Sequence, residues 1–357
     1  MTIDFWPTLQ LIAYARLAQS ILYTFNLEIL KRRFMFHLNV RPTYLKAIEE
    51  EVNKRIIPTV FRKKLIGVVT SLAWEVYKWF DCHGHFFQDS NLDLRNKLHW
   101  YSFGIIDRRQ TADNFILDGN LNIRERFHLA CKYCLKEDVH MLWMNMLTED
   151  QVHEFVRLRK TGTIEIWNKT LYRNDPIDFE ELSFNERLCF VFENYLGLRN
   201  YFSNLRGSLL RCQCFYFALE CRRVHHFDLY SCLVRMNADD ELNFMLISFP
   251  DLDFSKLFQI FLQWPFQNMF LDVVTNFQGY INEHVFYDLV QFILFEKLDC
   301  WQDHPYEKLF VLFWNLFGRY EDHVKKDAYM CAIVKYVLDN SEDFDRRKYW
   351  SFIDSVI

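Results

Sequence analysis

Glycine and proline are scarce in this chain, with 9 glycines and 7 prolines among 357 residues. Folds with many tight turns need both residues, because glycine reaches positive φ and proline presets φ at the first turn position. Loops that cradle phosphate groups also need clustered glycine. The scarcity argues against both kinds of structure and favours a mostly helical chain.

Apolar side chains are abundant enough to form a large core. The chain contains 36 Phe, 18 Tyr and 10 Trp residues, with 51% apolar and 25% charged residues overall. Disordered, low-complexity and collagen-like chains do not have this composition. We therefore expect a folded, aromatic-rich globular protein.

The charge balance gives no overall attraction to polyanions. The formal net charge is −5 at pH 7, which favours solubility. The basic clusters at residues 31–33, 62–64, 222–223 and 346–348 are short and scattered, as on solvated helix faces. We expect neither a nucleic-acid partner nor a membrane partner.

Two apolar stretches resemble membrane spans only in length. Residues 9–30 contain Arg16, and Pro265 and Asp272 interrupt residues 254–277, so neither stretch is predicted to cross a bilayer. No basic leader or small-residue cleavage site is recognisable in the first thirty residues. Without an export signal, the ten cysteines are expected to be reduced thiols. We therefore expect a cytoplasmic protein.

Apolar periodicity predicts an all-α fold. We expect a region of two long helical segments over residues 1–90, of which the second, residues 44–80, is kinked at Pro58. Helical hairpins are expected over 91–160. An irregular connection is predicted at 161–183, followed by a helical-hairpin array over 184–357 that continues the preceding hairpins. The clearest hairpin lies at residues 124–146. A weak similarity with a period near 60 residues leaves an α-solenoid and an irregular bundle both open.

A resemblance to a known family is strongest at residues 97–143. It is carried by the segments Lys97–Trp100, Gly104–Asp107, Thr111–Ala112, Arg126–Val139 and Leu142–Trp143. This pattern resembles an expanded family of uncharacterised all-helical invertebrate proteins. The hairpins are also faintly similar to degenerate ankyrin-type repeats, but they lack the Thr-Pro-Leu-His start and the 33-residue period. The resemblance implies a helical fold and no site residues.

Three cysteine patterns suggest metal or redox chemistry. Cys82 and His85 provide half of the four ligands that a structural zinc site needs. The pair Cys131 and Cys134 has the spacing of a redox dithiol but lies within a predicted helix, not at its start. The third set shares one helical face, although its span of about 16 Å is too long for one ion; it comprises Cys221, His225, Asp228 and Cys232. We expect structural roles for all three patterns and no cofactor.

The aromatic clusters are the remaining functional signal. Most rings should pack between helices, but exposed rings in a groove would be a protein-binding hot spot. The candidates are Trp264, Phe266, Phe270 and Trp314. We expect a non-enzymatic scaffold that binds a protein or peptide between stacked helices. The alternative is an enzyme or small-ligand-binding protein with a pocket between helices.

Overall fold

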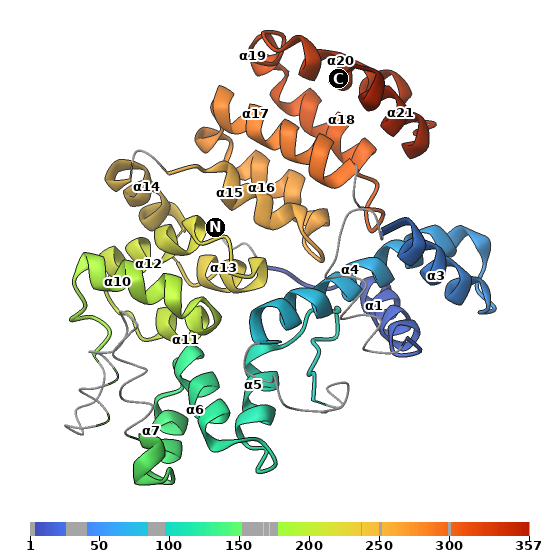
Figure 1. Ribbon diagram of the computed structural model, residues 1–357. Coiled ribbons are helices and arrows are strands. Elements are labelled where there is room, and N and C mark those ends of the chain that lie inside the picture. Colours follow the sequence, from blue (N-terminus) through green and yellow to red (C-terminus); the bar gives the residue numbers. More distant parts are fainter. Residues whose placement is uncertain are drawn as a thin grey trace. The chain divides into compact units, whose positions relative to one another are not determined.

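A computed structural model describes residues 4–25, 41–84, 97–151, 167, 171, 178–236, 238–249, 252–298 and 301–356. Within these residues the chain forms 18 α-helices joined by short turns and 3₁₀ segments, and no strand (Figure 1). Neighbouring helices pack in pairs. The predicted all-α fold of packed helices is confirmed. No described helix is both long enough and apolar enough to cross a bilayer.

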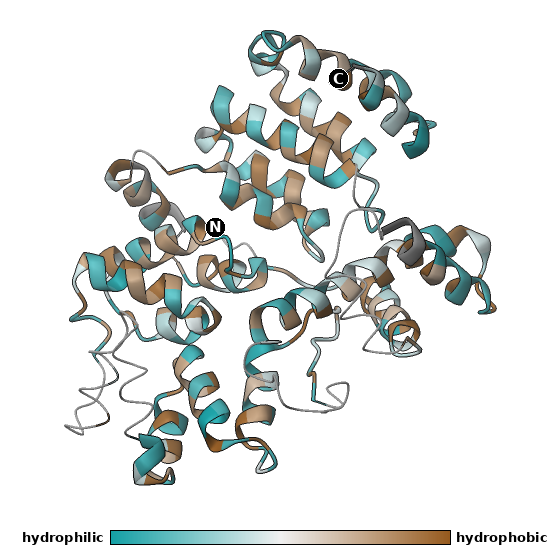
Figure 2. Cartoon of the chain, in the orientation of Figure 1, coloured by the Kyte–Doolittle hydropathy of each residue, from teal (hydrophilic) through white to brown (hydrophobic). Residues whose placement is uncertain are grey.

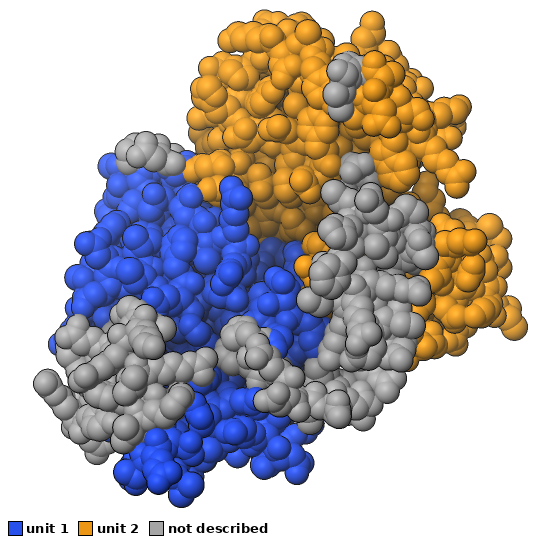
Figure 3. Space-filling model, in the orientation of Figure 1, with its two compact units in different colours: residues 1–4, 78–101, 106–252 blue, residues 5–77, 102–105, 253–357 orange. Residues whose placement is uncertain are grey.

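The chain divides into two compact units whose sequences interleave (Figure 3). Unit 1 comprises residues 1–4, 78–101 and 106–252, and unit 2 comprises residues 5–77, 102–105 and 253–357. The predicted boundaries at residues 90, 160 and 183 stay predictions, and most of the predicted connection at 161–183 lies outside the described residues.

Unit 1 is a set of short helices. After the end of α4 (Thr59–His83), which continues into this unit at Lys78, it contains α5 (Arg108–Ile116), α6 (Ile123–Lys132), α7 (Lys136–Met144), α10 (Phe184–Glu193), the 3₁₀ turn η4 (Tyr195–Gly197), α11 (Leu198–Ser203), α12 (Ser208–Glu220), α13 (His226–Leu233) and α14 (Ala238–Ser248). Helices α6 and α7 form the predicted hairpin, α5 packs on α6, and α12 packs on both α10 and α14.

The carboxyl end of α6 fastens this hairpin to the segment around α11. Cys134 has φ 56°, a left-handed conformation that costs a residue with a Cβ roughly 1–2 kcal/mol. There the backbone N–H of Leu135 donates to Ala130 O over 3.0 Å, which closes the helix end. Asn200 Nδ2 donates to Tyr133 O over 2.7 Å. Gly197 packs so closely that a Cβ would lie 2.6 Å from Cys134 Sγ.

Unit 2 combines long and short helices. It contains α1 (Leu9–Leu22), α3 (Arg41–Asn53), most of α4, α15 (Ser255–Gln259), α16 (Phe270–Asn276), α17 (Glu283–Gln291), α18 (Tyr306–Phe317), α19 (Glu321–Val324), α20 (Ala328–Asn340) and α21 (Arg346–Val356), with 3₁₀ turns at Ile260–Leu262, Gln267–Met269, Gln278–Tyr280 and Gly318–Tyr320. A π-helical segment, Phe292–Leu298, extends α17. In these helices apolar and polar residues occupy different faces (Figure 2).

Tilted aromatic rings in close contact form much of the core of unit 2. The Phe286 ring is fully buried and lies 5.4 Å from Phe313, 5.5 Å from Trp314 and 5.8 Å from Tyr320, between ring centroids. The Phe270 ring lies 5.3 Å from Phe313. Such pairs add about 0.5–1.5 kcal/mol beyond the burial of their area, so the abundance of Phe and Trp is explained here by packing.

Another contact in unit 2 joins α4 to the connection that precedes α18. Gly67 lies against the backbone of Gln302 and Asp303, where a Cβ would meet main-chain atoms within 2.5 Å. One turn later, Ser71 Oγ donates to Asp303 Oδ2 over 2.9 Å, and Gln267 Nε2 donates to the same oxygen over 2.7 Å. The buried Asp303 carboxylate thus connects three segments that are distant in sequence.

The predicted kink at Pro58 is wrong. Helix α3 ends at Asn53 and α4 begins at Thr59, so Pro58 directly precedes a new helix. At this place its fixed φ and missing N–H disturb no helical hydrogen bond. The two helices are separated by an exposed connection.

Substitution of Gly197 tests the contact at the end of α6. We expect Gly197→Ala to lower the free energy of unfolding by about 1–3 kcal/mol, because the new methyl group overpacks against backbone and sulfur atoms. Urea denaturation of the purified variant measures the loss. Gly119→Ala is the matched control, since its Cβ would meet no atom within 4 Å. Equal midpoints for the two variants would contradict the close approach.

Candidate functional site

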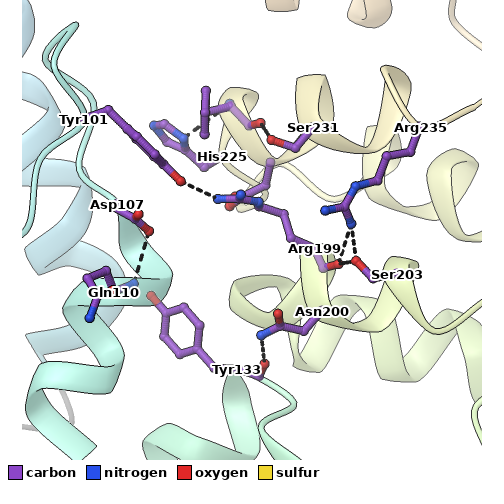
Figure 4. A network of polar contacts seen from close by, with 12 residues as sticks. Tyr101, Asp107, Gln110, Tyr133, Arg199, Asn200, Ser203, His225, Ser231 and Arg235 are labelled. Atoms are coloured by element: carbon purple, nitrogen blue, oxygen red, sulfur yellow. Dashed lines mark hydrogen bonds and ion pairs between the residues drawn. The ribbon is translucent and has the colours of Figure 1, made fainter.

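A polar pocket lies within unit 1 and has a cavity volume of about 70 Å³. Its lining comes from the start of α5, the end of α6, η4, α11, α13 and the turn after α13. Figure 4 labels five of these lining residues, Tyr133, Arg199, Asn200, Ser203 and Arg235. The lining residues are Arg108, Arg109, Tyr133, Leu196, Arg199, Asn200, Ser203, Asp228 and Arg235. Four guanidinium groups therefore surround a cavity that contains one carboxylate.

Arg199 is the most constrained of the four arginines. Its Nη1 donates to the Tyr101 hydroxyl over 3.2 Å (Figure 4), and its Nε lies 4.0 Å from Asp228 Oδ1. The guanidinium also lies over the Phe227 ring, 5.4 Å from the centroid. Because three partners hold it, little conformational entropy remains to be lost when it meets a ligand.

Arg235 reaches the pocket from the turn after α13. It donates to Arg199 O over 3.4 Å and to Ser203 Oγ (Figure 4). Within the described residues no carboxylate pairs with it. The Arg235 side chain is exposed, so its charge is available at the mouth of the pocket.

Helix α5 contributes two consecutive arginines from its first turn. The Asp107 side chain caps this helix and accepts from Gln110 N over 3.1 Å (Figure 4). Arg109 is partly exposed and pairs with Asp113 at 3.0 Å, whereas Arg108 is 4% exposed. Burial strengthens electrostatic interactions, so the buried charge of Arg108 adds to the positive potential in the pocket.

Two acid–base groups near the pocket keep one protonation state at neutral pH. His225 caps α13 by accepting from Phe227 N through Nδ1 over 3.3 Å. Burial, and then the charges of Arg108 and Lys78, lower the pKa of His225 well below its ordinary value of 6.5. Burial also raises the pKa of Tyr133 well above its ordinary value of 10. Neither group changes its charge near neutral pH, so the arginines dominate the field in the pocket.

The Tyr133 hydroxyl is engaged in the core. It lies 2.7 Å from His83 Nε2, and His83 Nδ1 lies 2.6 Å from Trp79 O. A carbonyl only accepts, so Nδ1 carries the proton and the Tyr133 hydroxyl donates to Nε2. This arrangement explains His83, which belongs to the predicted Cys82–His85 cluster, as a core residue.

The structure describes the candidate metal and redox residues only in part. Cys82 is half-buried, and His85 lies outside the described residues. Within the residues that are described, no group of three Cys, His, Asp or Glu side chains could hold a metal ion. Burial raises the pKa of Cys134 to about 12, whereas a redox dithiol needs a thiolate near neutral pH.

The third pattern is divided between separate roles. Cys221 is the C-cap of α12 and Cys232 is buried. His225 caps α13, and Asp228 lines the pocket beside Arg199. The helical face that was predicted to run from Cys221 to Cys232 is thus interrupted at residues 221–225.

The four aromatic candidates are buried. Trp264 and Trp314 are 8% exposed, and Phe266 and Phe270 are fully buried. Trp264 Nε1 donates to Phe103 O over 3.0 Å, and the Phe266 ring lies 5.0 Å from the Phe5 ring. All four contribute to the core of unit 2 in this conformation, and their role in binding a partner stays a prediction.

Comparison with known proteins gives no further assignment. No protein-family model, curated protein or solved structure matches the chain. The all-helical fold is shown by the structure alone, and the resemblance of residues 97–143 to an invertebrate family stays a prediction.

Sequence reasoning missed the arginine pocket. Its charged residues lie at 108, 109, 199, 228 and 235, and no local motif joins them. The one available signal was the pair Arg108-Arg109 directly after the helix-capping Asp107, because two cations in the first turn oppose the helix dipole.

Acidification tests the neutral state of His225. Its folded pKa lies below 6.5, so the unfolded chain binds this proton first and stability falls as pH drops below 6.5. The fall is at most about 1.4 kcal/mol per pH unit for one group. We expect His225→Asn, which retains a capping oxygen, to reduce this pH dependence in urea denaturation between neutral and mildly acidic pH. An unchanged slope would contradict this origin.

Proposed function

We propose that this protein binds a phosphate group, free or at the end of a small ligand, in the arginine-lined pocket of unit 1. The observation that carries the proposal is the excess of four guanidinium groups over one carboxylate in one small cavity. Arginine presents a planar fork of donors that matches a tetrahedral oxyanion, and buried guanidinium groups need anionic or hydrogen-bonding partners.

The pocket has the size and polarity for such a ligand. A cavity of about 70 Å³ has room for several water-sized groups but not for a drug-sized molecule. Asn200 and Ser203 add amide and hydroxyl groups to the lining. The exposed Arg235 and the buried Arg108 both line the cavity, so a bound phosphate would meet a solvent-accessible cation and a buried one.

The lining favours binding over catalysis. Among the described residues that line the cavity there is no cysteine or histidine, and the one carboxylate lies beside Arg199. A nucleophile or general base with a pKa near neutral is what an acid–base mechanism would need. This supports the small-ligand part of the sequence-based alternative rather than its enzymatic part.

Phosphate titration tests the proposal. We expect isothermal titration calorimetry to detect inorganic phosphate binding that weakens with added salt. Arg235→Gln should weaken it about tenfold or more, because a hydrogen bond to a charged group contributes about 1.5–3 kcal/mol. Arg222→Gln, an exposed arginine of the same unit that does not line the pocket, should leave affinity unchanged. Absence of binding, or equal losses in both variants, would overturn the proposal.

A second candidate is the predicted protein-binding scaffold, now through a different surface. Met141, Met144 and Leu147 are exposed at intervals of three residues along α7 and the turn after it. Met144 is 72% exposed and Leu147 is 73% exposed. Flexible methionines suit protein-binding surfaces because their side chains adapt to a partner.

A cytoplasmic location and the likeness to the invertebrate family remain inferences that rest on the sequence.

Affinity capture tests this second candidate. We expect a stoichiometric partner retained by the tagged wild-type protein to be lost with the double substitution Met144→Glu and Leu147→Glu, because two buried charges oppose association. Ile247→Glu, at a position 83% exposed in the same unit, is the matched control and should retain the partner. A partner that survives the double substitution, or none at all, would remove support for this surface.

A further inference from the structure

The connection between α3 and α4 forms an exposed, basic and apolar surface on unit 2. We call residues 54–64 the basic tip; they include the connection and the first turns of α4. Their sequence is Lys-Arg-Ile-Ile-Pro-Thr-Val-Phe-Arg-Lys-Lys, with five cations and no acidic residue. The tip therefore contains the three cations at residues 62–64 and two more at residues 54–55.

Large apolar side chains project from this tip. Ile56 is fully exposed, Val60 is 77% exposed and Phe61 is also exposed. Single exposed apolar residues are ordinary on protein surfaces. Three within six residues, next to cations, are more than single exposed positions. The Phe61 ring also lies 6.4 Å from the Tyr14 ring, between centroids, whereas Ile56 and Val60 are largely uncovered.

The tip is held in its exposed position by hydrogen bonds from one of its own cations. Arg62 Nε donates to Ile57 O over 2.9 Å, and Arg62 Nη1 donates to Asn53 Oδ1 over 3.4 Å. Ile57 N also donates to Arg55 O over 2.9 Å. The connection therefore has a defined shape, which lowers the entropy that would be lost on binding.

Two of the four remaining cations keep their charge available. Lys54 pairs with Glu51, and Lys64 Nζ lies over the Tyr14 ring at 5.1 Å from its centroid. Arg55 and Lys63 are exposed and pair with no carboxylate within the described part of the chain. Glu49, Glu50 and Glu51 precede the tip on α3, so the charge changes sign at Val52 and the tip itself is positive.

We propose that the basic tip docks on an anionic lipid surface. Ile56, Val60 and Phe61 would enter the boundary between headgroups and acyl chains, while Arg55 and Lys63 meet lipid phosphates and carboxylates. Exposed apolar side chains find no counterpart along a nucleic-acid backbone, which favours lipid. The sequence-based expectation of no membrane partner rests on the net charge, whereas docking depends on local charge. The inference is independent of the phosphate pocket.

Sedimentation with lipid vesicles tests the proposal on the full-length protein. We expect binding to vesicles that contain phosphatidylserine and little binding to pure phosphatidylcholine. The bound fraction should fall as salt rises from about 0.1 M to about 1 M, because the screening length drops from about 10 Å to about 3 Å. Replacement of Arg55 and Lys63 by Gln should reduce the partition coefficient about fivefold for each charge removed.

Matched variants separate docking from general effects. Ile56→Asn should reduce the partition coefficient about tenfold, the loss expected for one buried aliphatic side chain. Ile247→Asn removes an equally large exposed side chain from unit 1 and should have no effect. Lys325→Gln with Lys326→Gln removes two exposed charges elsewhere in unit 2 and should also have none.

Three results would overturn the proposal. The first is equal binding to phosphatidylserine and phosphatidylcholine vesicles. The second is unchanged vesicle binding in the Ile56→Asn and the Arg55→Gln, Lys63→Gln variants. The third is absence of vesicle binding together with tip-dependent binding of polyglutamate or a DNA oligonucleotide, which would assign the surface to an acidic polymer instead of lipid.

Discussion

The close approach of Gly197 to the carboxyl end of α6 is the constraint on which the pocket depends. A side chain at this position would meet the sulfur of Cys134 and the carbonyl of Lys132, so glycine lets η4 pack against the α6–α7 hairpin. Directly after it, α11 begins and presents Arg199, Asn200 and Ser203 to the cavity. Asn200 then bonds to Tyr133 O, which fixes the distance between the two walls of the pocket.

A second consequence of this packing is electrostatic. Arginines from α5, α11 and the turn after α13 converge although they are up to 127 residues apart in the sequence (108 to 235). Their mutual repulsion is opposed by Asp228 in the lining and by Asp113 beside Arg109. Concentrating like charges costs stability that a binding site recovers when its ligand arrives, which is why a surplus of cations is informative about function.

Unit 2 also contains a buried charged group, which hydrogen bonds stabilise. The buried Asp303 carboxylate accepts from Ser71 and Gln267, and burial raises its pKa above its ordinary value of 3.8. Hydrogen bonds from neutral donors compensate the carboxylate. The surrounding aromatic rings supply the apolar area, so the polar contact specifies how the segments align while the rings provide most of the stabilisation.

Particular residues show what kind of reasoning from the sequence succeeds. The apolar stripe at Phe127, Ala130 and Cys131 predicted the α6–α7 hairpin, because it depends on a helical period within a short segment. The interpretation of Pro58 was wrong. Proline occurs both at kinks inside helices and near helix starts, and the local sequence does not distinguish the two positions. Trp264 and Phe266 were candidates for a surface and are core residues in the connection between two 3₁₀ turns, since composition does not say which aromatic rings other segments cover.

The sequence by itself determined the helical class and the aromatic nature of the core, and it argued against loops built on glycine. These properties follow from local periodicity and from composition, which need no knowledge of which helices meet. Only the tertiary structure decided that Arg108, Arg199 and Arg235 share one cavity, and that Ile56 and Val60 stay outside the core. Both depend on contacts between distant segments, where burial and like-charge proximity are set by packing and not by neighbouring residues in the chain.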